Sequence, residues 1–92
     1  MYQVRIAPLA KRAIKKLSRS GRFDVKEIFV VINTLRDGKK LDASYRDHQL
    51  KGAMRTYREC HLAFDLLLVY EIDMTLNMLI VANIGTHEEI FD

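Results

Sequence analysis

Residues 54–85 read MRTYRECHLAFDLLLVYEIDMTLNMLIVANIG, and this stretch decides the fold class. Polar and apolar side chains alternate from residue 54 to residue 62, which is the period of a β-strand. Residues 66–72 and 78–84 are aliphatic runs, as in strands that are buried on both faces of a sheet. We therefore predict three consecutive strands that pair as an antiparallel meander and end before Gly85.

The N-terminal part of the chain predicts two helices. Residues 2–6 alternate weakly and form a candidate first strand. Apolar residues recur at helical spacing from Pro8 to Gly21, and again from Asp24 to Gly38. Two helices joined by such a short connection should pack as a hairpin. We therefore expect an α+β domain in which an N-terminal helical hairpin packs on a small antiparallel β-sheet.

Two pairs of residues have the spacing of a capping box. In this motif the side chain of the capping residue accepts a hydrogen bond from the backbone N–H three residues later. The side chain of that later residue accepts a hydrogen bond from the backbone N–H of the capping residue. Asp24 and Glu27 have this spacing before the second helix, and Thr86 and Glu89 have it after the last strand. We therefore expect a short helical turn to begin at His87.

The composition is that of a basic globular domain. The 92 residues carry a formal net charge of +3, with 49% hydrophobic and 29% charged residues. Lysines and arginines gather in residues 11–26 and 39–58. A basic surface attracts polyanions such as nucleic acid, an acidic membrane or an acidic protein, although a solvated helix face gives the same pattern. We expect residues 1–92 to form a single domain.

Cys60 is the only cysteine, so no disulfide can form within the chain, as in proteins of the reducing cytoplasm. It shares a strand face with Met54 and Leu62, which predicts a buried and unreactive thiol. No signal peptide is visible at the N-terminus. The longest apolar run, residues 66–70, is far shorter than the ~20 residues of a membrane helix. We therefore expect a cytoplasmic protein that does not bind a membrane.

The three histidines, His48, His61 and His87, lie near the ends of predicted strands, and Asp65 lies at the start of another. In a meander these ends can converge on one edge of the sheet. A lone histidine is more often an ordinary surface or core residue. The group of three, close in sequence to several arginines, is what indicates a site.

Cleavage of RNA by its own 2′-hydroxyl suits such a group. The reaction needs a base for the hydroxyl, an acid for the leaving 5′-oxygen and positive charge on the phosphate. Histidine serves in either proton role because its ordinary pKa is near ~6.5. The candidate phosphate ligands are Arg46, Arg55 and Arg58. No metal or other cofactor is required, because the nucleophile belongs to the substrate. A competing interpretation is a zinc site of two histidines and one aspartate.

Several segments carry a resemblance to a known family. Residues 45–52 (YRDHQLKG), 57–62 (YRECHL), 65–70 (DLLLVY) and 85–87 (GTH), together with Phe91, resemble the YafQ-like toxins of the RelE/ParE superfamily. The resemblance implies a RelE-like fold and an mRNA interferase of a type II toxin–antitoxin pair, which cuts messenger RNA on the translating ribosome. It also implies an acidic antitoxin with a DNA-binding N-terminus, through which alone the toxin reaches operator DNA.

The resemblance also implies roles for individual residues. The functional positions of the family match His48, His61, Asp65 and His87 here, and Phe91 would lie near the substrate. The match implies that His87 is the general acid, and that His48, or His61 with Asp65, supplies the base.

The candidate substrate-binding residues are Arg46, Lys51, Arg55, Arg58 and Phe91. The family often has an aromatic residue directly after the aspartate, where this chain has Leu66. The alternative function is that of a non-nuclease member of the superfamily, either a gyrase-directed toxin or a plain antitoxin-binding module. The complete set of histidines favours the nuclease.

Overall fold

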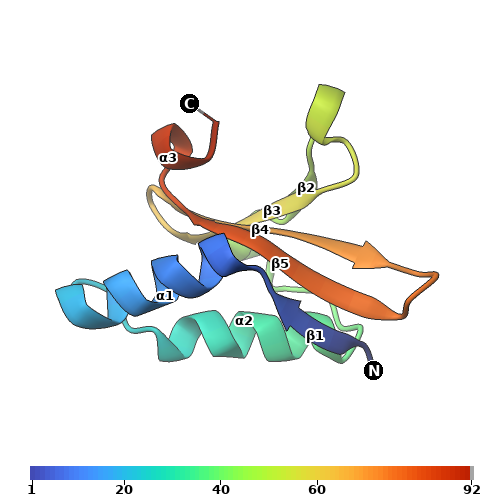
Figure 1. Ribbon diagram of the computed structural model, residues 1–92, viewed down its shortest axis with the longest axis horizontal. Coiled ribbons are helices and arrows are strands. Elements are labelled where there is room, and N and C mark those ends of the chain that lie inside the picture. Colours follow the sequence, from blue (N-terminus) through green and yellow to red (C-terminus); the bar gives the residue numbers. More distant parts are fainter. Residues whose placement is uncertain (92) are drawn as a thin grey trace.

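The structure, a computed structural model, describes residues 1–91 and has an α+β fold (Figure 1). A five-stranded sheet is covered on one face by two longer helices, and short 3-10 turns precede and follow its shortest strand. None of the described helices is long and apolar enough to cross a membrane. The elements are, in chain order, β1 (Gln3–Ile6), α1 (Pro8–Ser20), α2 (Lys26–Arg36), η1 (Ala43–Tyr45), β2 (His48–Gln49), η2 (Gly52–Met54), β3 (Arg58–Ala63), β4 (Leu66–Asp73), β5 (Met78–Gly85) and α3 (His87–Phe91).

Strands β3, β4 and β5 form the predicted antiparallel meander, in a sheet of order β1-β5-β4-β3-β2. The first of them begins at Arg58 rather than at Met54. The chain is still turning there, because η2 is followed by a backbone hydrogen bond from the Tyr57 N–H to the Met54 carbonyl. β2 adds a two-residue antiparallel pair to the edge of β3, with His48 opposite Glu59.

β1 lies along the free edge of β5 and runs parallel to it, so the sheet is mixed rather than wholly antiparallel. The sequence did not predict this, because alternation reveals a strand but not the direction of its partner. The long connection between the two strands permits it, since a parallel pair needs a crossover and not a tight turn.

The main hydrophobic core lies between the sheet and the helices α1 and α2, which cover the same face (Figure 1). This arrangement agrees with the predicted helical hairpin. Each large apolar side chain buried there contributes about 1.5–3 kcal/mol to stability. Cys60 is fully buried, and burial raises the pKa of its thiol to about 12, as expected of an unreactive cysteine. The core includes Ala10, Ile28, Val31, Ile32, Leu35, Leu68, Tyr70, Leu79 and Val81.

The two predicted capping boxes have different outcomes. The Thr86 N–H donates to Glu89 Oε1 at 2.9 Å, and the Glu89 N–H donates to Thr86 Oγ1 at 3.1 Å, so this box is complete. Asp24 Oδ1 accepts a backbone N–H at the start of α2 at 3.0 Å. The prediction for Glu27 is wrong, because its carboxylate accepts a hydrogen bond from the Tyr45 hydroxyl instead of the backbone at Asp24. This contact ties the loop before β2 to α2.

The other face of the sheet is flanked by α3 and η2, which project from it on the side away from α1 and α2 (Figure 1). Alternation along β3 decides which side chains reach each face. Cys60 and Leu62 belong to the helix-covered core. Glu59 and His61 therefore point to the opposite face, which we call the open face.

Candidate active site

The histidines converge on the open face as the meander predicted. The rings of His48 and His61 have centroids 6.1 Å apart, and those of His61 and His87 are 6.0 Å apart. His48 comes from β2, His61 from β3 and His87 from the first turn of α3. Residues distant in the sequence thus form one continuous group with His61 as the common neighbour.

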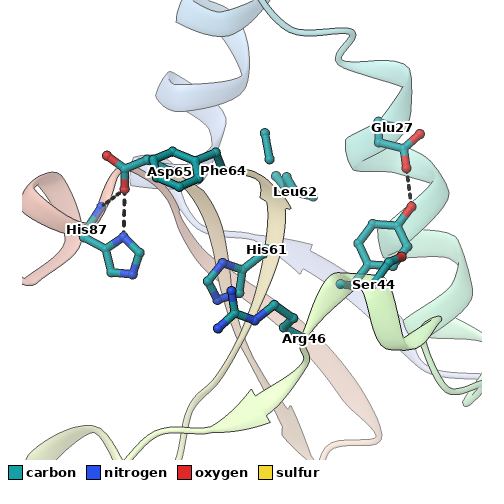
Figure 2. Close-up of a pocket in the computed structure, with 10 residues that line it drawn as sticks. Glu27, Ser44, Arg46, His61, Leu62, Phe64, Asp65 and His87 are labelled. Carbon is teal, nitrogen blue, oxygen red and sulfur yellow. Dashed lines mark hydrogen bonds and ion pairs between the residues drawn. The ribbon is translucent and has the colours of Figure 1, made fainter.

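His87 is held by Asp65 at the turn between β3 and β4 (Figure 2). Asp65 Oδ1 lies 2.7 Å from His87 Nδ1 and also accepts the His87 backbone N–H at 3.1 Å. These hydrogen bonds lower the pKa of Asp65, so the carboxylate is ionised at neutral pH. An ionised partner requires the proton of His87 on Nδ1, which leaves Nε2 for other chemistry.

The expected pairing of Asp65 with His61 is therefore wrong. The turn carries Asp65 towards the end of β5, because Leu67 lies opposite Gly85 in the sheet. His87 follows Gly85 by two residues and therefore forms the hydrogen bond with the Asp65 carboxylate. His61 has Glu59 as its acidic neighbour instead, with Oε1 3.8 Å from Nε2.

Glu59 is the principal site residue that sequence reasoning missed. Its side chain is only 6% exposed, and Oε1 lies 3.2 Å from His48 Nε2. Its second oxygen, Oε2, is buried and has no hydrogen-bond partner within residues 1–91. The available signal was the alternation itself, because Glu59 and His61 are two apart in one strand and therefore share a face.

His48 lies between the Arg46 carbonyl group and the Glu59 carboxyl group. His48 Nδ1 lies 2.8 Å from the Arg46 carbonyl oxygen, which only accepts, so Nδ1 carries a proton. Its Nε2 faces the Glu59 carboxyl at 3.2 Å.

His61 has the most enclosed ring of the three, with its side chain 14% exposed. Burial lowers the pKa of His61, and the positive charge of Arg46 lowers it further. Its imidazole is therefore neutral at physiological pH and able to accept a proton.

A cleft of about 840 Å³ opens beside these side chains at the end of the sheet where β3 turns into β4. His61, Asp65, His87, Arg46 and Phe64 all line it (Figure 2). Phe64 is 98% exposed. The cleft thus combines proton-transfer groups, a guanidinium and an aromatic surface. Phe91 adds a second aromatic ring on α3, with its centroid 6.3 Å from that of His87.

Arg46 is presented to the cleft by a tight turn. It adopts a left-handed conformation, with φ of 52°, directly after η1. The preceding Tyr45 is hydrogen-bonded to Glu27, which raises the pKa of the Tyr45 hydroxyl to about 12. The sequence identified Arg46 as a candidate but gave no indication that Tyr45 and Glu27 anchor its turn.

The remaining basic candidates lie further away. Arg58 belongs to the helix-covered face, where its Nε lies 3.4 Å from Asp47 Oδ1 and 3.3 Å from the Tyr70 hydroxyl. Its role in substrate binding is still a prediction. Lys51 and Arg55 flank η2, are exposed, and lie on the segment that projects beside the open face (Figure 1).

One group of residues could hold a metal ion. The competing interpretation from the sequence was a zinc site of two histidines and one aspartate. The structure gathers His48, Glu59 and His61 instead, with one potential ligand atom of each within 4.8 Å of the others. Asp65 is not part of this group, because its carboxylate is hydrogen-bonded to His87.

Comparisons with known proteins identify the family of this chain. A family model described as the bacterial toxin of type II toxin–antitoxin system, YafQ, matches residues 2–92. The mRNA interferase toxin YafQ of Escherichia coli strain K12 is 29% identical over 77 residues, which cover 83% of this chain and 82% of that protein.

Solved structures show the same fold. A metal-bound toxin from Helicobacter pylori is 37% identical with a TM-score of 0.92, and the match covers 99% of this chain and 100% of that one. YafQ in the E. coli DinJ–YafQ toxin–antitoxin complex is 23% identical with a TM-score of 0.85, covering 99% of this chain and 98% of that one, which is evidence for the fold alone. The chain therefore belongs to the YafQ family of toxins of bacterial type II toxin–antitoxin systems.

Proposed function

We propose that this protein is an endoribonuclease toxin that cleaves messenger RNA on the translating ribosome. Its similarity to a protein named mRNA interferase toxin YafQ supports the activity. The observation that carries the proposal is the 2.7 Å contact between Asp65 and His87 beside His61 and Arg46 in one cleft. These groups supply an acid, a base and an anion-binding cation to the same space.

His87 acts as the general acid that protonates the leaving 5′-oxygen. Asp65 holds Nδ1, so Nε2 is the atom that donates. A helix N-terminus disfavours a protonated imidazole. Here the helix is a single five-residue turn, whereas the ionised Asp65 is in direct contact with the ring.

His61 acts as the base for the 2′-hydroxyl. Its lowered pKa keeps the imidazole neutral, which a base requires. His48, which is half exposed and bound to Glu59, orients the RNA beside it. Each proton transfer by a positioned side chain is worth roughly 10²–10⁴-fold in rate.

The RNA is held by charge and by stacking. Arg46 binds the scissile phosphate, because a guanidinium matches two phosphate oxygens at once. Phe64 and Phe91 stack on bases, a role that Leu66 cannot fill. Lys51, Arg55 and Arg58 contact phosphates further along the strand, so binding should weaken as salt rises.

Cleavage does not need a metal ion, because the attacking hydroxyl is part of the RNA. The H. pylori relative is metal-bound in its crystal structure. In this chain a metal held by His48 and His61 would occupy ring nitrogens that the reaction needs free.

An acidic antitoxin inhibits the protein and links it to operator DNA. E. coli YafQ forms a toxin–antitoxin complex with DinJ. An apolar groove of about 540 Å³ between α1 and the end of β5 suits an amphipathic acidic segment that folds on binding. It is lined by Leu9, Ala13, Leu17 and Ile84 and by the basic residues Arg12, Lys16 and Arg22.

The cleavage products test the reaction. Purified protein added to ribosomes translating a defined message should yield upstream fragments with a 2′,3′-cyclic phosphate or 3′-phosphate and downstream fragments with a 5′-hydroxyl. His87→Ala should abolish cleavage and keep the fold. Fragments with a 3′-hydroxyl and 5′-phosphate would indicate metal-assisted attack by water and overturn the proposal. A gyrase-directed toxin would leave the message intact.

A further inference from the structure

A hydrogen bond in the helix-covered core reaches the loop that precedes β2. Tyr70 lies on β4, the central strand of the sheet, and is only 1% exposed. Its hydroxyl lies 2.8 Å from Asp47 Oδ1 and 3.0 Å from Oδ2, and it donates to this carboxylate. Burial, followed by the hydrogen bond to Asp47, raises the pKa of the Tyr70 hydroxyl, so the hydroxyl keeps its proton and remains a donor.

Arg58 completes a network of three side chains around this bond. Its Nε lies 3.3 Å from the Tyr70 hydroxyl and 3.4 Å from Asp47 Oδ1. Arg58 stands directly opposite Tyr70 in the register of β3 and β4. The Asp47 carboxylate therefore has both a hydroxyl donor and a positive charge beside it. Hydrogen bonds that involve a charged group are stronger than neutral ones, so the network is a firm attachment for the loop.

Asp47 lies between two residues of the candidate active site. Arg46 lines the cleft, and His48 faces Glu59 on the open face. The side chain of Asp47 points the other way, to Tyr70. The loop is therefore anchored in the core by its middle residue, while the side chains before and after that residue reach the site.

The two neighbours depend on the conformation of the chain at Asp47. The Arg46 carbonyl oxygen lies 2.8 Å from His48 Nδ1, so the backbone on one side of Asp47 orients the ring on the other side. Arg46 has a φ of 52°, a left-handed conformation that is uncommon for a residue with a side chain. β2 pairs with β3 over only two residues, and such a short edge pair is weak by itself. The side chain of Asp47 adds a second attachment, to the core.

We propose that Asp47 is a positioning residue for RNA cleavage, whose attachment to Tyr70 keeps the guanidinium before it and the imidazole after it in place beside the substrate. Asp47 does not touch the RNA and transfers no proton. Its loss lets the loop between η1 and β2 move, and both neighbouring side chains move with the loop. The effect on cleavage rests on the proposed function, whereas the positioning of His48 does not.

Magnetic resonance of the histidine rings tests the positioning without RNA. Tyr70→Phe removes the hydroxyl and keeps the aromatic ring in the core. The ring proton and nitrogen signals of His48 should shift or broaden, because its Nδ1–H contact depends on the loop. The ring signals of His87 should stay in place, because Asp65 holds that ring from a different turn.

Tyr2→Phe is the matched control. The Tyr2 hydroxyl lies 3.8 Å from Met74 Sδ, in the turn between β4 and β5, at the opposite end of β4 from the cleft. This variant should leave the signals of both rings in place. Unmoved His48 signals in Tyr70→Phe would overturn the positioning. Equal shifts of His48 and His87 would also overturn it, because they would indicate a general loosening of the sheet.

Cleavage assays test the consequence for the reaction, at a temperature at which thermal melts show each variant to be folded. Asp47→Ala should lower kcat/KM about 10²-fold, the effect of a displacement of about 1 Å in a site, and Tyr70→Phe about tenfold. Asp47→Asn keeps an acceptor for the hydroxyl and should retain more activity than Asp47→Ala. The double variant Asp47→Ala/Tyr70→Phe should be no slower than Asp47→Ala, because both changes break one contact.

The outcomes separate the proposal from the proposed function. Normal kcat/KM in folded Asp47→Ala and Tyr70→Phe would overturn the role of Asp47 in the reaction, and so would losses that simply add in the double variant. If the unsubstituted protein cleaves no RNA, the proposed function fails, and the spectra of His48 still decide whether Asp47 positions that ring.

Discussion

Replacement of Asp65 by asparagine tests whether the contact with His87 is catalytic. The amide has nearly the same shape as the carboxylate but no charge. Its carbonyl oxygen can still accept the His87 backbone N–H, which now lies at 3.1 Å. It cannot balance the charge of a protonated ring at 2.7 Å. The substitution therefore separates the electrostatic role of Asp65 from its role in the turn.

We expect cleavage to fall about 10²-fold, near the lower end of the effect of a general acid, because His87 stays in place but loses the negative charge beside its ring. kcat and kcat/KM should fall together, since the lost interaction is made in the transition state. The side chains of His87 and Asp65 are 54% and 49% exposed, so the melting temperature should change by no more than about 4 °C.

The assay is single-turnover cleavage of a ribosome-bound message, with thermal melts of the same preparations. Asp73→Asn is the matched control, because Asp73 Oδ1 accepts the Leu76 N–H at 3.0 Å in the turn between β4 and β5, away from the cleft. It should cleave normally. If Asp65→Asn lost much of its melting temperature yet cleaved normally below it, Asp65 would be a turn cap and our reasoning would be refuted.

Three further outcomes are expected. Arg46→Gln removes a charge that helps to lower the pKa of His61, so the acid limb of kcat/KM against pH should move to higher pH, because a base works only when deprotonated; an unmoved limb would exclude His61 as the base. Phe64→Ala removes a side chain that is 98% exposed, so the melting temperature should hold while RNA binding weakens about 5–150-fold, the worth of one stacked base; unchanged affinity would remove Phe64 from the site. Tyr45→Phe deletes the hydrogen bond to Glu27 and should lower the free energy of unfolding in urea by about 1 kcal/mol; no change would show that this bond does not anchor the loop.

Much of the fold follows from local pattern. Alternation and aliphatic runs predicted β3, β4 and β5, and the spacing of Thr86 and Glu89 predicted the start of α3. These features depend on neighbours in the sequence. The parallel pairing of β1 with β5 does not, because it depends on which sheet edge is left free after the meander forms.

The site shows the same limit. The convergence of three histidines was predictable, because the ends of neighbouring strands meet. The partner of Asp65 was not, since it depends on the register that sets Leu67 opposite Gly85. The importance of Glu59 was also missed, because burial of a charged residue is invisible until the pairing of β2 with β3 is known.

The site has two halves, His87 with Asp65 and the β2–β3 residues His48, Glu59 and His61. Different structural elements hold the two halves, so the position of one can change without a change in the other. His87 is set by a capping box and a turn carboxylate, all outside the β2–β3 pair. Glu59 and His61 are locked two residues apart on β3, whereas His48 belongs to a strand of only two residues at the sheet edge. β2 is therefore the element most easily displaced, since short edge pairing is weak. We therefore expect RNA that contacts His48 to displace this edge more readily than it displaces His87.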